Sequence, residues 1–166
     1  MEMTIRRILV ALLSISLLLT MGCAGTLAPS NSFQLTPNRG VPEPSTGNAM
    51  VCVYRIWHFK SGGATLYVFK DGNIVGVSHR GSYFCHETPP GEYSYYVEWG
   101  GFFEKVRTSA IIRAEANRQH FISFLADVPD MKEVSKTLAL KEIQGLEYAE
   151  YSQRALPGDR HYRAGP

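Results

Sequence analysis

The stretch Asp71–Val97, D-G-N-I-V-G-V-S-H-R-G-S-Y-F-C-H-E-T-P-P-G-E-Y-S-Y-Y-V, decides the fold of this chain. Asp71-Gly72 lies between two runs rich in β-branched and aromatic residues, and glycine tolerates the positive φ that a tight hairpin turn requires. Pro90-Gly91 predicts a second turn, in which proline presets the first φ and Gly91 takes a positive φ. The stretch therefore predicts short strands joined by turns.

Strand-like runs recur at short spacing through the middle of the chain. The clearest alternation lies in Glu92–Trp99, where Tyr95 and Val97 fall on one face and Tyr96 on the other, which indicates a strand with one buried face. Arg118–Leu125 is apolar on both faces toward its end, which predicts a central strand. The pattern predicts an all-β fold, a single antiparallel β-sandwich of the transthyretin-like or immunoglobulin-like kind. The expected strands are Met50–Trp57, Ala64–Lys70, Asn73–His79, Ser82–Glu87, Glu92–Trp99, Val106–Ala114 and Arg118–Leu125.

The end of the chain is ambiguous. We expect a last strand around Thr137–Ile143, followed by a short C-terminal helix that opens at Gly145 and runs to about Arg154. The alternative is one helix from Met131 onward, because Lys, Glu, Leu and Ala are good helix formers. The sandwich domain is then residues 50–155, and residues 156–166 form a loose tail without apolar anchors.

Residues 1–22 have the pattern of an export signal. Arg6 and Arg7 give a basic start, and an apolar run follows from Ile8 to Leu19. This run is too short to span a bilayer comfortably as a permanent helix, so a cleaved signal peptide fits it better.

The segment L-L-L-T-M-G-C, which ends at Cys23, resembles the lipobox of bacterial lipoproteins. The resemblance implies cleavage between Gly22 and Cys23, a diacylglycerol thioether on Cys23, and acylation of the new amino terminus. Thr20 departs from the usual leucine, and an ordinary secretory signal with an incidental cysteine is the alternative. Ala24 replaces the aspartate that commonly retains lipoproteins in the inner membrane, so the resemblance implies the outer membrane, facing the periplasm.

Residues 23–49 are expected to be the lipidated cysteine and a flexible tether. The segment is rich in proline and glycine and has little hydrophobic periodicity. A flexible coil of the 26 residues after Cys23 would have an end-to-end distance of about 28 Å. Such a tether would let the domain stand away from the membrane.

Charge gives no sign of a polyanionic partner. Removal of residues 1–22 takes away Glu2, Arg6 and Arg7, which leaves 15 basic and 14 acidic residues. Nucleic-acid-binding proteins usually carry a strongly basic face or a recognisable reader motif, and the sequence has neither. We therefore expect no nucleic-acid partner.

Several short segments resemble a family of small bacterial envelope lipoproteins, the family numbered 2846 among domains of unknown function. The resemblance covers roughly residues 50–145, and it implies a β-sandwich in the envelope without supplying catalytic residues. Its turns also look like those of carboxypeptidase-regulatory-like and transthyretin-like sandwiches. The segments are V-Y-R at Val53–Arg55, the D-G-N-I-V-G hairpin, G-S-Y-F at Gly81–Phe84, P-P-G-E-Y at Pro89–Tyr93 and the late apolar strand.

Two cysteines, Cys52 and Cys85, remain once Cys23 is lipidated. An even number in an exported domain favours a disulfide, whereas two buried free thiols are the alternative because sequence gives no distance between them. Cys85 and His86 cannot form a catalytic dyad with each other, because adjacent residues of a strand point to opposite faces. The five histidines lack the spacing of a local metal site, so we expect no metal and no cofactor.

Aromatic residues supply the candidate binding surface. Tyr96 lies on the face opposite the predicted core, and glycines separate Trp99 from Phe102 and Phe103 in W-G-G-F-F. Such a loop tip could hold a partner or enter lipid, whereas burial over one end of the sandwich is the alternative.

Two functions follow from this pattern. The first is a non-enzymatic, membrane-anchored envelope lipoprotein whose sandwich is a binding or assembly module for another envelope protein or a polysaccharide. The alternative is an envelope hydrolase or carbohydrate-modifying enzyme, which would need acid and base groups that converge in a cleft. A concave pocket where Glu87, Glu98 or Glu104 approaches a histidine would favour the enzyme, and a flat apolar patch would favour the binding module.

Overall fold

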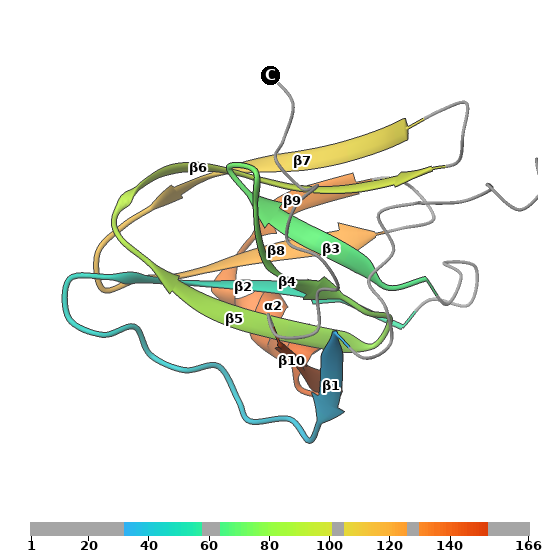
Figure 1. Cartoon of the computed structure of the whole chain (residues 1–166). Coiled ribbons are helices and arrows are strands. Elements are labelled where there is room, and N and C mark those ends of the chain that lie inside the picture. The colour runs from blue at the N-terminus through green and yellow to red at the C-terminus, as the bar shows by residue number, and fades with distance from the viewer. Residues whose placement is uncertain (1–31, 58–63, 101–104, 126–129, 153–166) are drawn as a thin grey trace, which may run out of the picture.

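The computed structural model describes residues 32–57, 64–100, 105–125 and 130–152, which form a two-layer β-sandwich with one short helix (Figure 1). The larger sheet has the strand order β1-β10-β5-β2-β8-β9, and the smaller has the order β4-β3-β6-β7. The elements are β1 (Phe33–Thr36), β2 (Ala49–Arg55), β3 (Leu66–Lys70), β4 (Asn73–Ser78), β5 (Ser82–Thr88), β6 (Gly91–Gly100), β7 (Lys105–Ala114), β8 (Gln119–Leu125), β9 (Asp130–Val134), α2 (Lys136–Ile143) and β10 (Glu147–Tyr151).

The expected all-β sandwich is confirmed. Each of the seven predicted strands is present with ends within two residues of those expected, and β8 is central, between β2 and β9. Most neighbouring strands are antiparallel, but β2 pairs with β8 and β10 pairs with β5 in parallel. The chain crosses between the sheets after β2, β4, β5 and β7, so sequential strands often belong to different layers.

The main core lies between the two sheets. Val51 and Val53 of β2 point into it, together with Phe84, Val97 and Ile122 from neighbouring strands. The intervening residues Cys52 and Tyr54 of β2 point to the opposite face, where they pack beneath α2. Strand β2 is therefore buried on both faces, which explains its nearly continuous apolar sequence.

The two predicted turns have different outcomes. Asp71 and Gly72 both have positive φ, 47° and 85°, so they form the expected hairpin between β3 and β4. The expectation for Gly91 is wrong: Gly91 is the first residue of β6, pairs with Ala114, and does not have a positive φ. Because β5 and β6 belong to different sheets, Pro89-Pro90 carries the chain between layers and no hairpin turn is needed.

The order of elements near the end of the chain is the reverse of the expected one. Residues predicted as a strand form α2, whose N-cap Ser135 accepts a hydrogen bond from the backbone N–H of Leu138. Ala139 and Ile143, one turn apart, are the buried residues of this helix. The predicted helix is instead strand β10, in which E-Y-A-E-Y alternates between faces.

Part of the predicted tether belongs to the domain. Phe33–Thr36 forms edge strand β1, which pairs antiparallel with β10. The next segment, residues 37–48, crosses the outer face of the larger sheet and is called the strap below (Figure 1). Val41 of the strap packs on the cluster under α2. Signal residues 1–22, Cys23 and tail residues 156–166 lie outside the described residues.

Candidate functional site

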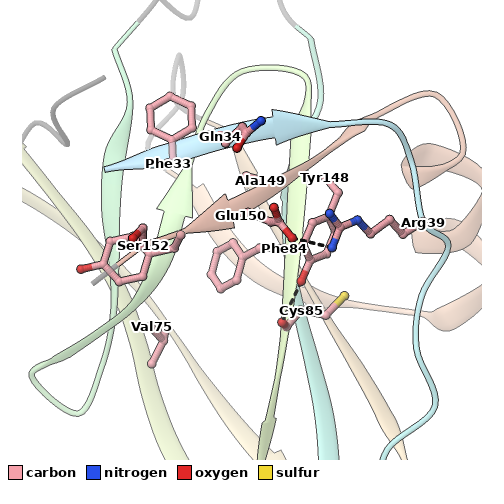
Figure 2. A pocket seen from close by; sticks show the side chains of 11 residues that line it. Phe33, Gln34, Arg39, Val75, Phe84, Cys85, Tyr148, Ala149, Glu150 and Ser152 are labelled. Carbon is pink, nitrogen blue, oxygen red and sulfur yellow. Dashed lines mark hydrogen bonds and ion pairs between the residues drawn. The ribbon is translucent and has the colours of Figure 1, made fainter. Parts of the chain in front are cut away.

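The candidate site is a cleft of about 700 Å³ at the edge of the larger sheet (Figure 2). Its volume is typical of small-molecule sites. Apolar side chains from β4, β5 and β10 form one part of the lining, and charged or amide side chains from β1, β10 and the strap form the other. The lining residues are Phe33, Gln34, Arg39, Val75, Phe84, Cys85, Tyr148, Ala149, Glu150, Tyr151 and Ser152.

Arg39 is the central charged group of the cleft. Its Nη1 lies 2.6 Å from Oε1 of Glu150, and its guanidinium lies 5.0 Å from the centre of the Tyr148 ring. The Tyr148 hydroxyl donates to the backbone oxygen of Cys85 at 3.4 Å, which fixes the ring over β5. Both members of the ion pair are about half exposed, so Arg39 is held in place while solvent still reaches it.

The strap positions Arg39 through its neighbours. The side-chain amide of Asn38 donates to the carbonyl oxygens of Ile143, the last residue of α2, and of Leu146 in the turn that follows, at 2.7 and 3.0 Å. The Arg39 backbone N–H donates to the Tyr83 hydroxyl at 3.1 Å. That hydroxyl lies within donating distance of the Gly40 oxygen, at 2.9 Å, and burial raises its pKa.

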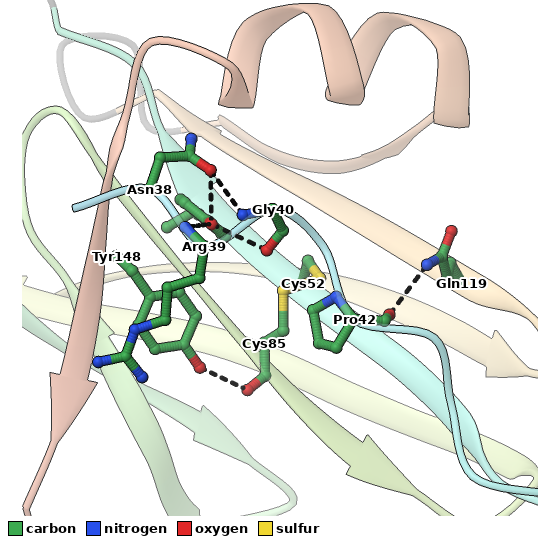
Figure 3. The surroundings of a disulfide bond; sticks show 9 residues. Asn38, Arg39, Gly40, Pro42, Cys52, Cys85, Gln119 and Tyr148 are labelled. Carbon is green, nitrogen blue, oxygen red and sulfur yellow. Dashed lines mark hydrogen bonds between the residues drawn. A yellow bond between two sulfur atoms is a disulfide. The ribbon is translucent and has the colours of Figure 1, made fainter. Parts of the chain in front are cut away.

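Further along, the strap is joined to the sheet by polar contacts. Gln119 donates from its side chain to the Pro42 oxygen at 2.9 Å (Figure 3). Ser45 donates to the Glu87 carboxylate from both its backbone and its hydroxyl, at 2.7 and 2.6 Å, and these bonds lower the pKa of Glu87. These contacts hold the strap along the sheet, although most of its residues are exposed.

A disulfide joins Cys52 and Cys85 beneath the strap (Figure 3). The two residues are directly opposite each other on antiparallel strands β2 and β5, with Cα atoms 4.0 Å apart. Cys52 is fully buried, whereas Cys85 is only partly buried and lines the cleft. The structure therefore holds the disulfide and not the two free thiols.

The predicted aromatic binding surface is not formed at Tyr96. Tyr96 lies on the outer face as expected, but only 8% of its surface is exposed. Its ring stacks on Phe69 at 4.9 Å, and the guanidinium of Arg107 lies 4.2 Å from the ring centre. The expectation of an exposed Tyr96 platform is therefore wrong. The side chain of Trp99, and residues Phe102 and Phe103, lie outside the described residues.

His86, which follows the cleft residue Cys85 in β5, is held by hydrogen bonds at both ring nitrogens. His86 points away from the disulfide, toward the other sheet, and its Nε2 accepts from the Tyr95 hydroxyl at 3.0 Å. Its Nδ1 lies 3.2 Å from the Glu87 backbone oxygen. Because a carbonyl oxygen can only accept a hydrogen bond, Nδ1 carries the proton. Burial lowers the pKa of His86. Cys85 and His86 thus point to opposite faces and form no dyad.

A second, more polar cleft of about 490 Å³ brings a glutamate and a histidine together, although the glutamate is Glu133 and none of the three expected for an enzyme. Nδ1 of His120 lies 2.8 Å from Oε1 of Glu133. The Glu115 backbone N–H donates to Nε2 at 3.1 Å, which assigns the proton of the neutral ring to Nδ1. Both ring nitrogens are therefore already bound, and His120 would have to break a hydrogen bond to act as a base.

Sequence reasoning missed the main cleft because two of its elements were assigned to other structures. Arg39 fell in the expected tether, and Tyr148 and Glu150 fell in the expected helix. The signal that was present is the alternation of F-Q-L-T at Phe33–Thr36 and of E-Y-A-E-Y at Glu147–Tyr151. Each run is short, and only their pairing across the length of the chain forms the cleft.

Comparison with known proteins found no family model, no curated protein and no solved structure that matches the chain. Within the described residues, no three histidine, cysteine, aspartate or glutamate side chains are grouped as a metal site. No helix in the same part of the chain has the length and hydropathy to cross a bilayer.

Proposed function

We propose that this chain is a lipoprotein of the bacterial envelope, anchored through Cys23 in the outer membrane and facing the periplasm, whose sandwich is a non-enzymatic binding or assembly module. The disulfide between Cys52 and Cys85 is the observation that carries this proposal. Stable disulfides belong to oxidising compartments, so the bridge supports export independently of the signal-like residues 1–22. It also engages both cysteines other than Cys23, which leaves the Cys23 thiol for the diacylglycerol thioether.

The main cleft supports a binding role. Arg39 supplies five donors in a fixed plane, Gln34 supplies an amide, and Phe33 and Val75 supply apolar surface. This mixture suits a polar ligand that has an apolar face, such as a sugar ring or a peptide segment. The partner that we propose is accordingly another envelope protein or a polysaccharide.

Among the described residues, the pair of His120 and Glu133 supports the alternative of an envelope hydrolase or carbohydrate-modifying enzyme. Each nitrogen of His120 is hydrogen-bonded, and the arrangement holds the loop before β8 against β9. A binding module therefore explains the described contacts with fewer rearrangements.

Fractionation of the full chain tests the anchor. We expect wild-type protein in the outer-membrane fraction with an acylated N-terminal Cys23, whereas Cys23→Ser should release it to the soluble periplasmic fraction. Wild-type protein that is soluble and unacylated would contradict the anchor, and wild-type protein in the inner membrane would contradict the placement alone.

Crosslinking in whole cells tests the cleft. Arg39→Glu reverses the charge opposite Glu150, and Arg113→Glu is the matched control because it reverses an exposed ion pair with Glu92 on the other sheet. Exposed pairs contribute only about 0–1 kcal/mol, so both variants should fold. We expect the crosslinked partner to be lost with Arg39→Glu and kept with Arg113→Glu. Equal yields from both variants would exclude the cleft as the binding site.

A further inference from the structure

Ser32 and Ser152, the first and last described residues, are neighbours in the fold. The backbone N–H of Ser152 donates to the carbonyl oxygen of Ser32 at 3.0 Å, next to the pairing of Phe33 with Tyr151. Ser32 is fully buried, so the domain is already ordered at this residue. The start of β1 is thus a fixed point from which the chain leads back toward Cys23.

Only eight residues, 24–31, join this fixed point to the proposed anchor at Cys23. A chain spans at most about 3.3–3.6 Å per residue, so Ser32 lies within about 30 Å of Cys23 even when the linker is fully extended. The strap and β1 together remove residues 32–48 from the expected tether. With Cys23 as the anchor, the surface around Ser32 therefore stays within about 30 Å of the bilayer surface.

An exposed tryptophan lies beside this point. The ring of Phe33 lies 5.3 Å from that of His79, in the turn between β4 and β5. The next residue of the same turn, Arg80, places its guanidinium 4.7 Å from the centre of the Trp57 ring. The side chain of Trp57 is 60% exposed. Phe33 and Trp57 therefore flank one short turn.

This turn has the chemistry of a membrane interface. Tryptophan is enriched where its ring can lie at head-group level, and arginine binds phosphate with a planar set of donors. Arg80 forms no ion pair in the described part of the chain. Burial lowers the pKa of His79, and Arg55 and Arg80 lower it further, whereas Glu147 acts in the opposite direction. The turn is thus electropositive and carries an exposed aromatic side chain.

We propose that the Trp57–Arg80 end of the sandwich lies on the bilayer, with the Trp57 indole at head-group depth and Arg80 bound to the phosphates of anionic phospholipids. This inference rests on the proposed anchor at Cys23. It adds an orientation: the Asp71-Gly72 end of the sandwich points away from the membrane. Strand β4 joins the two turns, so they lie about 20 Å apart.

Fluorescence quenching in vesicles tests the orientation. The full acylated chain is reconstituted in phosphatidylethanolamine and phosphatidylglycerol vesicles whose acyl chains carry bromine near the head group. Trp99→Phe leaves Trp57 as the only tryptophan. The control adds Trp57→Phe and Ile111→Trp, because Ile111 is 67% exposed and pairs with Ser94 beside the Asp71 turn. We expect at least twofold quenching of Trp57 and none at position 111.

The lipid dependence tests the role of Arg80. Arg80→Gln should reduce the quenching of Trp57. Replacement of phosphatidylglycerol by phosphatidylcholine should also reduce it in the Trp99→Phe protein that keeps Arg80. If Trp99→Phe does not fold, the wild-type protein and Trp57→Phe are compared instead. The difference in quenching between these two proteins then reports the quenching of Trp57. Flotation with the vesicles reports the anchor separately. The inference would be overturned if the protein floats with the vesicles but Trp57 and position 111 are quenched equally. It would also be overturned if the quenching of Trp57 did not depend on anionic lipid.

Discussion

The side-chain amide of Asn38 lies 2.7 Å from the carbonyl oxygen of Ile143, the last residue of α2. A residue of the strap therefore caps a helix that is more than a hundred residues later in the chain. Asn38→Ala should lower the free energy of unfolding by about 1–3 kcal/mol, because it removes a donor from part-buried carbonyls and an acceptor from Tyr83. Urea unfolding measures the change. Asn73→Ala, which removes one long bond at an exposed turn, should have a smaller effect, and equal losses would contradict the capping role.

The disulfide should make a large contribution to stability. Closing a loop with a sequence separation of 33 residues is worth about 3–4 kcal/mol in the chain-entropy model. Reduction, or Cys52→Ala with Cys85→Ala, should lower the urea midpoint accordingly. Alkylation of the unreduced, acylated protein should label no cysteine, and a labelled pair of thiols in periplasmically prepared protein would contradict the bridge.

Gly76 should not tolerate a side chain. A Cβ at this position would lie 2.4 Å from the Phe84 ring, in the core between β4 and β5. Gly76→Ala should therefore cost about 1–3 kcal/mol through overpacking. Gly145→Ala is the matched control, because no atom lies within 4 Å of its Cβ position. Thermal unfolding of the two variants compares them directly, and a wild-type midpoint for Gly76→Ala would show that β4 can move away from Phe84.

Stability should fall as pH decreases below the usual histidine pKa of 6.5. Burial lowers the pKa of both His79 and His86 in the folded protein, so the unfolded chain binds more protons in this range. The stability contributed by the neutral rings is complete above pH 6.5 and is lost as pH falls toward the folded pKa values. Urea midpoints between pH 7.5 and 5 measure this slope, which His86→Gln should reduce. Glu87 and Glu115, with lowered pKa values, lose their contribution only at more acidic pH.

The central strands could be predicted from sequence because each carries a local signal. Tyr95 and Val97 are fully buried on one face of β6, as the alternation indicates. The signal for the Asp71-Gly72 hairpin is likewise local, because aspartate and glycine tolerate the positive φ that the turn requires. The cysteine count raised the disulfide as one of two alternatives, and the facing positions of β2 and β5 decide between them.

The remaining elements depend on contacts that sequence does not display. Helix α2 could not be distinguished from a strand by composition, and its docking through Ala139 and Ile143 decides the outcome. Strand β1 has four residues and becomes a strand only because β10 pairs with it. The cleft around Arg39 depends on both assignments, so a local interpretation of either segment could not find it.

The pairing of β1 with β10 has a consequence for the export that we propose. Thr36 and Tyr148 are 112 residues apart, and the sheet edge between them is among the most non-local parts of the fold. In a chain exported from its N-terminus, β1 emerges first and must wait, unpaired, until β10 has also been translocated. Helix capping by Asn38 waits for the same moment. Under the export that we propose, the cleft and the contacts that fix the start of β1 would therefore form together, after β10 has left the translocon.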